Sequence, residues 1–85
     1  MDQSIDKSMR VLAIFYRAMK GESISVKSLA LEYGVSTKSI SRDINDIKNF
    51  LCDHRELVGN TELLYNGQTK AYQLQFDSFL LNEEL

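Results

Sequence analysis

The chain has 85 residues, of which 44% are hydrophobic and 26% are charged, proportions typical of one folded globular domain rather than of a disordered segment. No apolar run approaches the roughly 20 residues of a membrane span, no basic region leads into a secretion signal, and the single cysteine excludes an internal disulfide, so the sequence predicts a cytoplasmic protein without membrane contact. The formal net charge is −2, but residues 7 to 48 carry eight Lys or Arg against four acidic residues, or +4, so an anionic partner is not excluded for this half.

The first predicted element is a helix over residues 5 to 20. Apolar side chains recur there at steps of three or four, which is the helical period, and Gly21 follows as a stop. The predicted buried face carries Ile5, Met9, Leu12, Phe15 or Tyr16, and Met19.

The next stretch has the signals of two helices joined by a tight turn. Ile24 is expected in a short extended piece, and Ser25 is the predicted cap of a helix that begins at Val26. Gly34 suits the left-handed position that ends a helix, and Ser36 can cap the helix after it. The sequence therefore predicts a sharp corner at residues 34 to 36.

The helix after the corner is predicted to run from Thr37 to about Cys52. With about 100° of rotation for each residue, one apolar stripe lies within about 40° of its centre; it consists of Ile40, Ile44, Ile47 and Leu51. The opposite face is polar and basic, and carries Lys38, Arg42, Asn45 and Asn49, with Ser41 and Lys48 on one flank. Asp43 lies to the side of this face, and we expect it to pair with Arg10 or Arg17 of the first helix.

A β-hairpin is predicted near the end of the chain. Residues 53 to 61 are expected to fray into a loop, and Asn66-Gly67 is a strong turn signal between two β-type runs. Tyr72, Leu74 and Phe76 alternate and should face the core. A two-residue turn would place Leu63 on that same face, whereas a bulged turn would place Leu64 there.

Few other residues suggest chemistry. Cys52 and His54 are the only thiol and imidazole, and on a helix they point in nearly opposite directions, so they cannot form a nucleophile–base pair. The favoured interpretation is a half-buried cysteine and a solvent-facing histidine, with no metal or cofactor. Most aromatic residues are predicted in the core, and Tyr65 is left undecided; the predicted core aromatics are Phe15, Tyr16, Tyr33, Phe50, Tyr72 and Phe76.

Together these elements predict a mainly α fold with a small hairpin, in the order of a winged helix-turn-helix. In that fold the second helix of the corner enters the DNA major groove and the hairpin, or wing, contacts the backbone or minor groove. The predicted DNA-binding residues are Ser36, Thr37, Lys38, Ser41, Arg42, Asn45, Lys48, Asn66, Gln68 and Lys70. Arg42 is suited to guanine, Asn45 to adenine and Lys38 to phosphate.

Two other interpretations remain open from the residues alone. Lys and Arg on an outer helix face commonly serve solubility, and the same face could instead meet an acidic protein partner. A small enzyme is the third possibility, but no pair of titratable groups is arranged for catalysis. We therefore predict a DNA-binding domain that is not an enzyme, with a protein-interaction module as the alternative.

The stretch "ISVKSLALEYGVSTKSISRDINDIKNFL" resembles the DeoR-like winged helix-turn-helix, in which "GVS" leads into a helix with Thr or Ser, Ile, and then "RD". The resemblance covers residues 8 to 76, and Thr37 stands where that family often has a basic residue. The ending "LQFDSFLLNEEL" is similar to the segment that precedes a WYL ligand-sensing domain. The resemblance implies a DNA-binding domain at 1–76 of a bacterial transcriptional regulator, with 77–85 starting a linker or next domain. It also implies a homodimer formed through regions outside 1–85 and an effector site in a following domain.

Overall fold

A computed structural model describes residues 6–76 of the chain, so the predicted start at Ile5 and the predicted linker at 77–85 lie outside the described residues. The described part is mainly helical with one two-stranded antiparallel sheet, as the sequence predicts for the fold class. In chain order the elements are α1 (Lys7–Met19), α2 (Val26–Tyr33), α3 (Thr37–Asp53), α4 (Arg55–Val58), β1 (Glu62–Asn66) and β2 (Ala71–Gln75).

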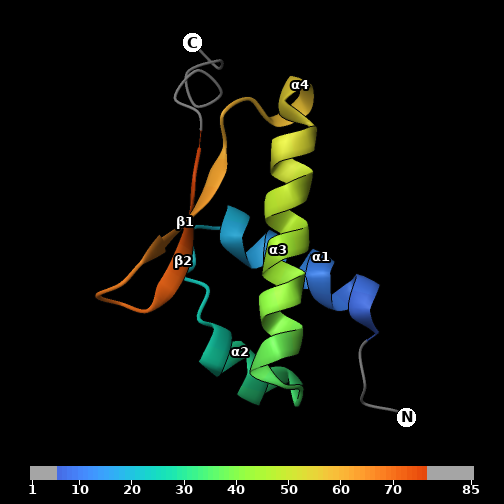
Figure 1. Cartoon of the computed structure of the whole chain (residues 1–85), viewed down its shortest axis with the longest axis vertical. Helices are drawn as coiled ribbons and strands as arrows, with labels where there is room; N and C mark the ends of the chain where they lie inside the picture. Colours follow the sequence, from blue (N-terminus) through green and yellow to red (C-terminus); the bar gives the residue numbers. More distant parts are fainter. Residues whose placement is uncertain (1–5, 77–85) are drawn as a thin grey trace.

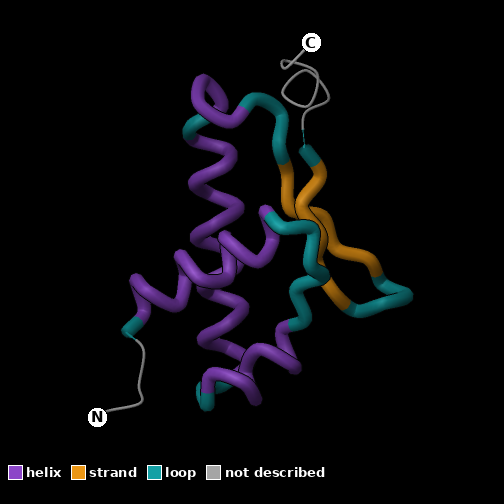
Figure 2. The backbone as a smooth tube through the Cα atoms, turned by 180° about the vertical axis from the view of Figure 1, so that it is seen from behind, coloured by secondary structure: helices purple, strands orange, loops and turns teal. Residues whose placement is uncertain are grey.

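The long helix α3 forms the centre of the arrangement (Figure 1). It packs against α1, α2 and β1, and α1 also contacts β2. α1 crosses α3, α2 lies beside the first turns of α3, and the hairpin runs alongside α3 next to the end of α1 (Figure 2). Within residues 6–76 no helix combines the length and the apolar character that crossing a membrane requires.

The corner between α2 and α3 is built by the predicted capping residues. Ser25 Oγ accepts a hydrogen bond from the Ser28 amide at 3.2 Å and begins α2. Gly34 has φ 67° and ψ 36°, a left-handed conformation that ends α2 at little cost because glycine has no Cβ. Ser36 Oγ then accepts from the Ser39 amide at 3.1 Å and begins α3. The predicted sharp turn at residues 34 to 36 is confirmed.

The hydrophobic core forms around the predicted stripe of α3. Ile40, Ile44, Ile47 and Leu51 are each at most 3% exposed. They pack with buried residues of the other elements, which are Ile14, Ala18, Ile24, Leu29, Ala30, Leu63 and Leu74. Because one side of α3 is committed to this core, its polar side is held outward.

The buried face of α1 differs from the prediction. Arg10, Ile14 and Ala18 are buried, whereas the expected core residues of this helix face outward, with exposed fractions of 57% for Met9, 63% for Leu12, 63% for Tyr16 and 49% for Met19. The helix is apolar over much of its circumference, so spacing alone does not select a face. The observed rotation buries Ile14 and Ala18 and brings Arg10 against Asp43 of α3, a pairing that the apolar period does not predict.

The hairpin has the predicted inward face but a longer loop. Leu63 lies opposite Leu74, and Asn66 pairs with Ala71, which leaves a four-residue loop at 67–70 instead of a two-residue turn. A four-residue loop preserves the alternation of a two-residue turn, so Leu63 rather than Leu64 is buried. The partly buried Tyr72 and Phe76 join the buried Leu74 at the core, as predicted.

The predicted extended piece at Ile24 joins the hairpin. Ile24 N donates to the Tyr72 carbonyl at 2.7 Å, and Tyr72 N donates to the Ile24 carbonyl at 2.8 Å. The connection between α1 and α2 is therefore fixed to β2.

Several predictions for the residues around the end of α3 are wrong. The loop expected after Asp53 contains the single turn α4, whose closing bonds run from Val58 N and Gly59 N to the carbonyls of His54 and Arg55. Cys52 is exposed, because it lies about 120° from Ile40 around the helix. His54 is partly buried because its ring stacks on Phe50 with centroids 4.5 Å apart.

Two aromatic residues expected in the core are exposed. Tyr16 is 63% exposed and Phe50 is 41% exposed. Tyr16 lies on the outer face of α1. Phe50 lies about 80° from the stripe of α3 around the helix, and its ring packs edge-on against that of Phe15 with centroids 6.3 Å apart. The other four predicted core aromatics are partly buried against the core, and they are Phe15, Tyr33, Tyr72 and Phe76.

Candidate nucleic-acid interface

The outer face of α3 is open along its first half. Thr37, Lys38, Ser41, Arg42 and Asn45 are all exposed. Because the isoleucine stripe of α3 is buried, these side chains point away from the core. Together they present cationic, hydroxyl and amide groups on a helix that extends from a tight corner.

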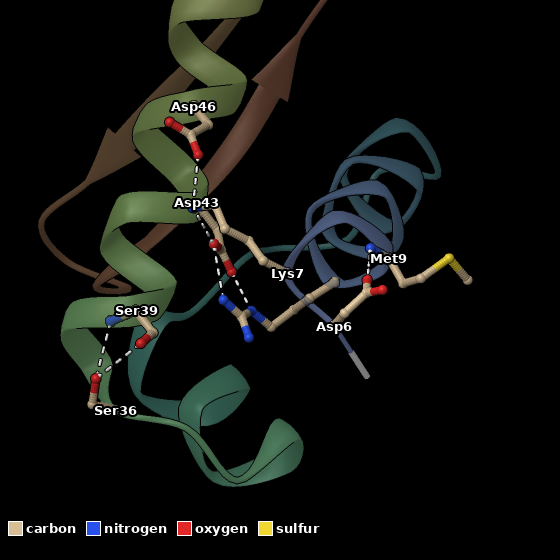
Figure 3. Close-up of polar contacts among 8 residues, drawn as sticks. Asp6, Lys7, Met9, Ser36, Ser39, Asp43 and Asp46 are labelled. Atoms are coloured by element: carbon tan, nitrogen blue, oxygen red, sulfur yellow. Dashed lines mark hydrogen bonds and ion pairs between the residues drawn. The ribbon is translucent and has the colours of Figure 1, made fainter. Parts of the chain in front are cut away.

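Two of the ten predicted DNA-binding residues use a side-chain oxygen in hydrogen bonds within the chain itself. Ser36 caps α3 and also donates a hydrogen bond to Ser39 Oγ at 3.2 Å (Figure 3). Asn66 Oδ1 accepts from the amides of Gln68 at 2.8 Å and Thr69 at 3.4 Å. These two oxygens shape the corner and the hairpin loop, so both side chains hold the backbone of the surface in place.

The loop of the hairpin forms a second polar surface away from the helices (Figure 1). Gln68, Thr69 and Lys70 are exposed there. Lys70 has φ 56°, the only positive φ outside glycine in residues 6–76. A lysine is strained in this region because its Cβ lies close to the backbone, so the cation stands in the loop at a cost in stability.

Lys48 connects the two surfaces. Its Nζ lies 5.6 Å from the centroid of the Tyr72 ring on β2, which is within the range of a cation–π contact. Tyr65, undecided from the sequence, is 56% exposed and lies tilted against Tyr72 with centroids 5.0 Å apart. The structure thus joins α3 to the base of the hairpin through Lys48.

Two acidic residues of α3, Asp43 and Asp46, are neutralised by cations of α1. Asp43 is fully buried and accepts hydrogen bonds from Arg10 Nε and, at 3.2 Å, from Arg10 Nη2. Lys7 Nζ lies 3.3 Å from Asp43 Oδ1 and 2.9 Å from Asp46 Oδ2 (Figure 3). The hydrogen bond to Asp43 raises the pKa of Arg10, and those to Asp46 and Asp43 raise the pKa of Lys7. Of the two predicted partners of Asp43, Arg10 is therefore correct.

Arg17, the other predicted partner of Asp43, pairs instead with Glu22 and Glu32. Its Nε lies 2.9 Å from Glu22 Oε1, and its Nη1 lies 2.9 Å from Glu32 Oε2. Lys20 Nζ adds a longer contact of 3.9 Å to Glu22. The hydrogen bond with Glu22 is the main reason that the pKa of Arg17 is raised. Both acidic residues are thus engaged by cations of α1.

The pairing leaves a distinct set of free cations. Between residues 7 and 48, all four acidic side chains are paired, and each pairs with a cation of α1. Within the described part of the chain, no ion pair involves the other four cations of this stretch, Lys27, Lys38, Arg42 and Lys48. Lys27 is exposed on α2 and was not among the predicted DNA-binding residues. The sequence offered one signal for it, since Lys27 is one of the eight basic residues that give residues 7 to 48 their positive balance.

Two further features of residues 6–76 concern metal ligands and a polar hollow. In residues 6–76, no three His, Cys, Asp or Glu side chains gather closely enough to hold a metal ion. Lys48 and Cys52 border a hollow between α3 and β1 with a volume of about 190 Å³, which Arg55 and Glu62 also line.

Comparison with known protein families, with curated proteins and with solved structures found no match.

Proposed function

We propose that residues 6–76 form a winged helix-turn-helix domain that binds double-stranded DNA with sequence preference, as the DNA-binding part of a transcriptional regulator. In this proposal α3 enters the major groove, α2 lies across the backbone, and the loop at 67–70 is the wing on a neighbouring phosphate strand or minor groove. The resemblance of the corner sequence to DeoR-like regulators of bacteria supports the same assignment.

The observation that carries the proposal is the separation of charges around α3. Asp43 and Asp46 are neutralised from the α1 side, while Lys38 and Arg42 face solvent and have no ionic partner among residues 6–76. A chain with net charge −2 thereby exposes a locally cationic helix face. Such a face attracts phosphates and releases their counterions on binding.

The side chains of α3 have distinct proposed roles. The Arg42 guanidinium carries two parallel donors that match O6 and N7 of guanine, and the amide of Asn45 matches adenine. Lys38, near the start of the helix, is assigned to a phosphate, where it fixes position without reading sequence. Lys70 and Gln68 on the wing add affinity rather than base preference.

The test is DNA binding by the chain across a series of salt concentrations, with Arg42→Ala and Lys38→Ala compared on a preferred duplex and on random duplexes. Arg42→Ala should lose about 1–3 kcal/mol on the preferred duplex and flatten the difference between duplexes. Lys38→Ala should weaken all duplexes alike and lower the slope of log K against log salt by about one. Arg55→Ala, which removes an exposed cation on α4, is the matched control.

The same measurements distinguish DNA binding from the alternative function, a protein-interaction module. Binding to DNA that is undetectable at low salt, or equally affected by Arg42→Ala and Arg55→Ala, contradicts the proposal. A protein-interaction module would instead retain its cationic face for an acidic protein and show no linear dependence of DNA affinity on log salt.

A further inference from the structure

We propose that α1 forms a two-fold contact between two copies of this chain, with the two α1 helices packed antiparallel. The sequence predicts dimerisation through regions outside 1–85, and this contact adds one within the described residues. It is independent of DNA binding and rests on the outward face of α1.

The outward face of α1 is an apolar stripe. It consists of Met9, Leu12, Tyr16 and Met19, each about half to two-thirds exposed. The stripe lies roughly opposite Ile14 and Ala18, which hold α1 to the core. Isolated exposed apolar residues need no explanation, but four on one line of a 13-residue helix form a continuous surface.

The spacing of the stripe is that of a helix-pairing seam. The four residues are separated by steps of three, four and three, which are alternate a and d positions of a heptad. Because this order is the same in both directions, an antiparallel copy places Met9 opposite Met19 of the partner subunit and Leu12 opposite Tyr16 of the partner subunit. A surface that is complementary to itself in this way is what a two-fold axis requires.

The charges beside the stripe favour the same orientation. Asp6, Ala13 and Lys20 are seven residues apart and lie along one flank of the helix. In the antiparallel pair, Asp6 at the start of one helix approaches Lys20 of the partner subunit, and this happens twice. Ala13, at the middle of the flank, is small enough to let the helices approach. Antiparallel alignment also places opposite ends of the helix dipoles together, whereas a parallel pair would place like charges together.

The surface next to Leu12 is hollowed. A groove with a volume of about 230 Å³ is lined by Val11, Leu12, Phe15, Ile47, Phe50 and Asp46. Five of these six side chains are apolar, and the groove opens where Tyr16 of the partner subunit would lie. An aromatic side chain from the second copy can therefore cover the partly exposed Phe50.

The contact leaves the candidate DNA-binding surface open. α1 packs on the buried side of α3, and Figure 2 shows α1 crossing α3 on the side turned away from the view of Figure 1. If the proposed function holds, the dimer presents two copies of α3 related by a two-fold axis, which suits a site with two inverted halves.

Sedimentation equilibrium of the wild-type chain without DNA tests the contact. One short helix gives an interface of the weak class, below about 1,200 Å², so the concentration should reach about 500 µM. Wild type should dimerise, and Leu12→Glu should weaken dimerisation at least tenfold. Leu31→Glu is the matched control, because it places the same change at an 81% exposed leucine on α2 and should have no effect. Helical circular dichroism checks folding, and Tyr16→Lys replaces Leu12→Glu if that variant unfolds.

A wild-type chain that stays monomeric at this concentration overturns the proposal. So does a folded Leu12→Glu chain that dimerises as tightly as Leu31→Glu. Neither measurement involves DNA, so either failure leaves the proposed function intact.

Cysteine cross-linking tests the orientation. Leu12→Cys and Tyr16→Cys are each made in a Cys52→Ser background and oxidised separately or as a mixture. Opposed residues 12 and 16 can reach disulfide distance, whereas two copies of residue 12 are displaced by about 6 Å along the helices. The mixture should therefore cross-link faster than either variant alone. Faster cross-linking of the separate variants indicates a parallel pair and overturns the antiparallel contact.

Discussion

The cations of α1 and those of α3 have opposite surroundings although they are the same residue types. Carboxylates contact all three cations of α1 and the lysine that follows it, which are Lys7, Arg10, Arg17 and Lys20. On α3, Lys38, Arg42 and Lys48 have no carboxylate partner in the described part of the chain. The difference shows that the charge relevant to a partner is what remains after internal pairing, and the formal count of −2 hides it.

The two sets also differ in what they contribute to the fold. The Arg10–Asp43 pair is buried and joins α1 to α3. Arg42, the residue before Asp43, is directed outward because the isoleucine stripe of α3 is buried. The paired cations of α1 thus link two helices, while the unpaired cations of α3 stay on the surface.

The largest expected effect comes from breaking the buried pair. Asp43→Ala leaves the Arg10 guanidinium buried without a counter-charge, which should lower the free energy of unfolding by about 3–5 kcal/mol. Urea denaturation measures this loss. Asn45→Ala, two residues along on the exposed face, is the control and should change stability by less than about 0.5 kcal/mol. Equal stability of the two variants would show that the pair does not hold the helices together.

An intermediate effect of opposite sign is expected at the wing. Lys70→Gly removes an unpaired cation from a left-handed conformation that glycine adopts freely. Its free energy of unfolding should rise by up to about 1 kcal/mol, since relief of the Cβ clash exceeds the added entropy of the unfolded chain. DNA affinity should fall at the same time. A variant that is destabilised would show that Lys70 makes a stabilising contact, which would remove the contrast with α1.

The smallest effect is expected at Lys7, the exposed member of the ion pairs between α1 and α3, and it depends on pH. Hydrogen bonds to Asp46 and Asp43 raise the pKa of Lys7 above its ordinary 10.5, so the folded chain binds this proton more tightly than the unfolded chain. The contribution to stability is complete below pH 10.5 and is lost as the pH rises through the folded pKa. The difference in urea midpoint between wild type and Lys7→Met should therefore be constant near neutral pH and shrink above pH 10.5. A difference that grows with alkalinity contradicts this pairing.

The sequence predicts the parts of the molecule that depend on local backbone chemistry. Ser25, Gly34 and Ser36 mark helix ends because their side chains, or the absence of one, act within a few residues. The isoleucine stripe of α3 is equally clear, since its opposite face is polar throughout. The exposure of Arg42 and Asn45 follows from that stripe alone.

The rest depends on contacts between distant residues. α1 is apolar on several sides, so its apolar period does not show that Ile14 enters the core and Leu12 does not. The Asn66-Gly67 signal likewise does not give the length of the hairpin loop, because Asn66 pairs with Ala71 across the sheet. The exposed stripe on α1 could not be found before this rotation was known.

The Ile24–Tyr72 bridge has a consequence for how the chain folds. Its two hydrogen bonds join the connection between α1 and α2 to the last strand, so closing them requires the whole intervening chain to be brought together. Contacts of such high sequence separation carry a large loop-closure entropy and form late. We therefore expect α2 and α3 to assemble before the hairpin docks, so that the final geometry of the wing is acquired only when the domain is otherwise complete.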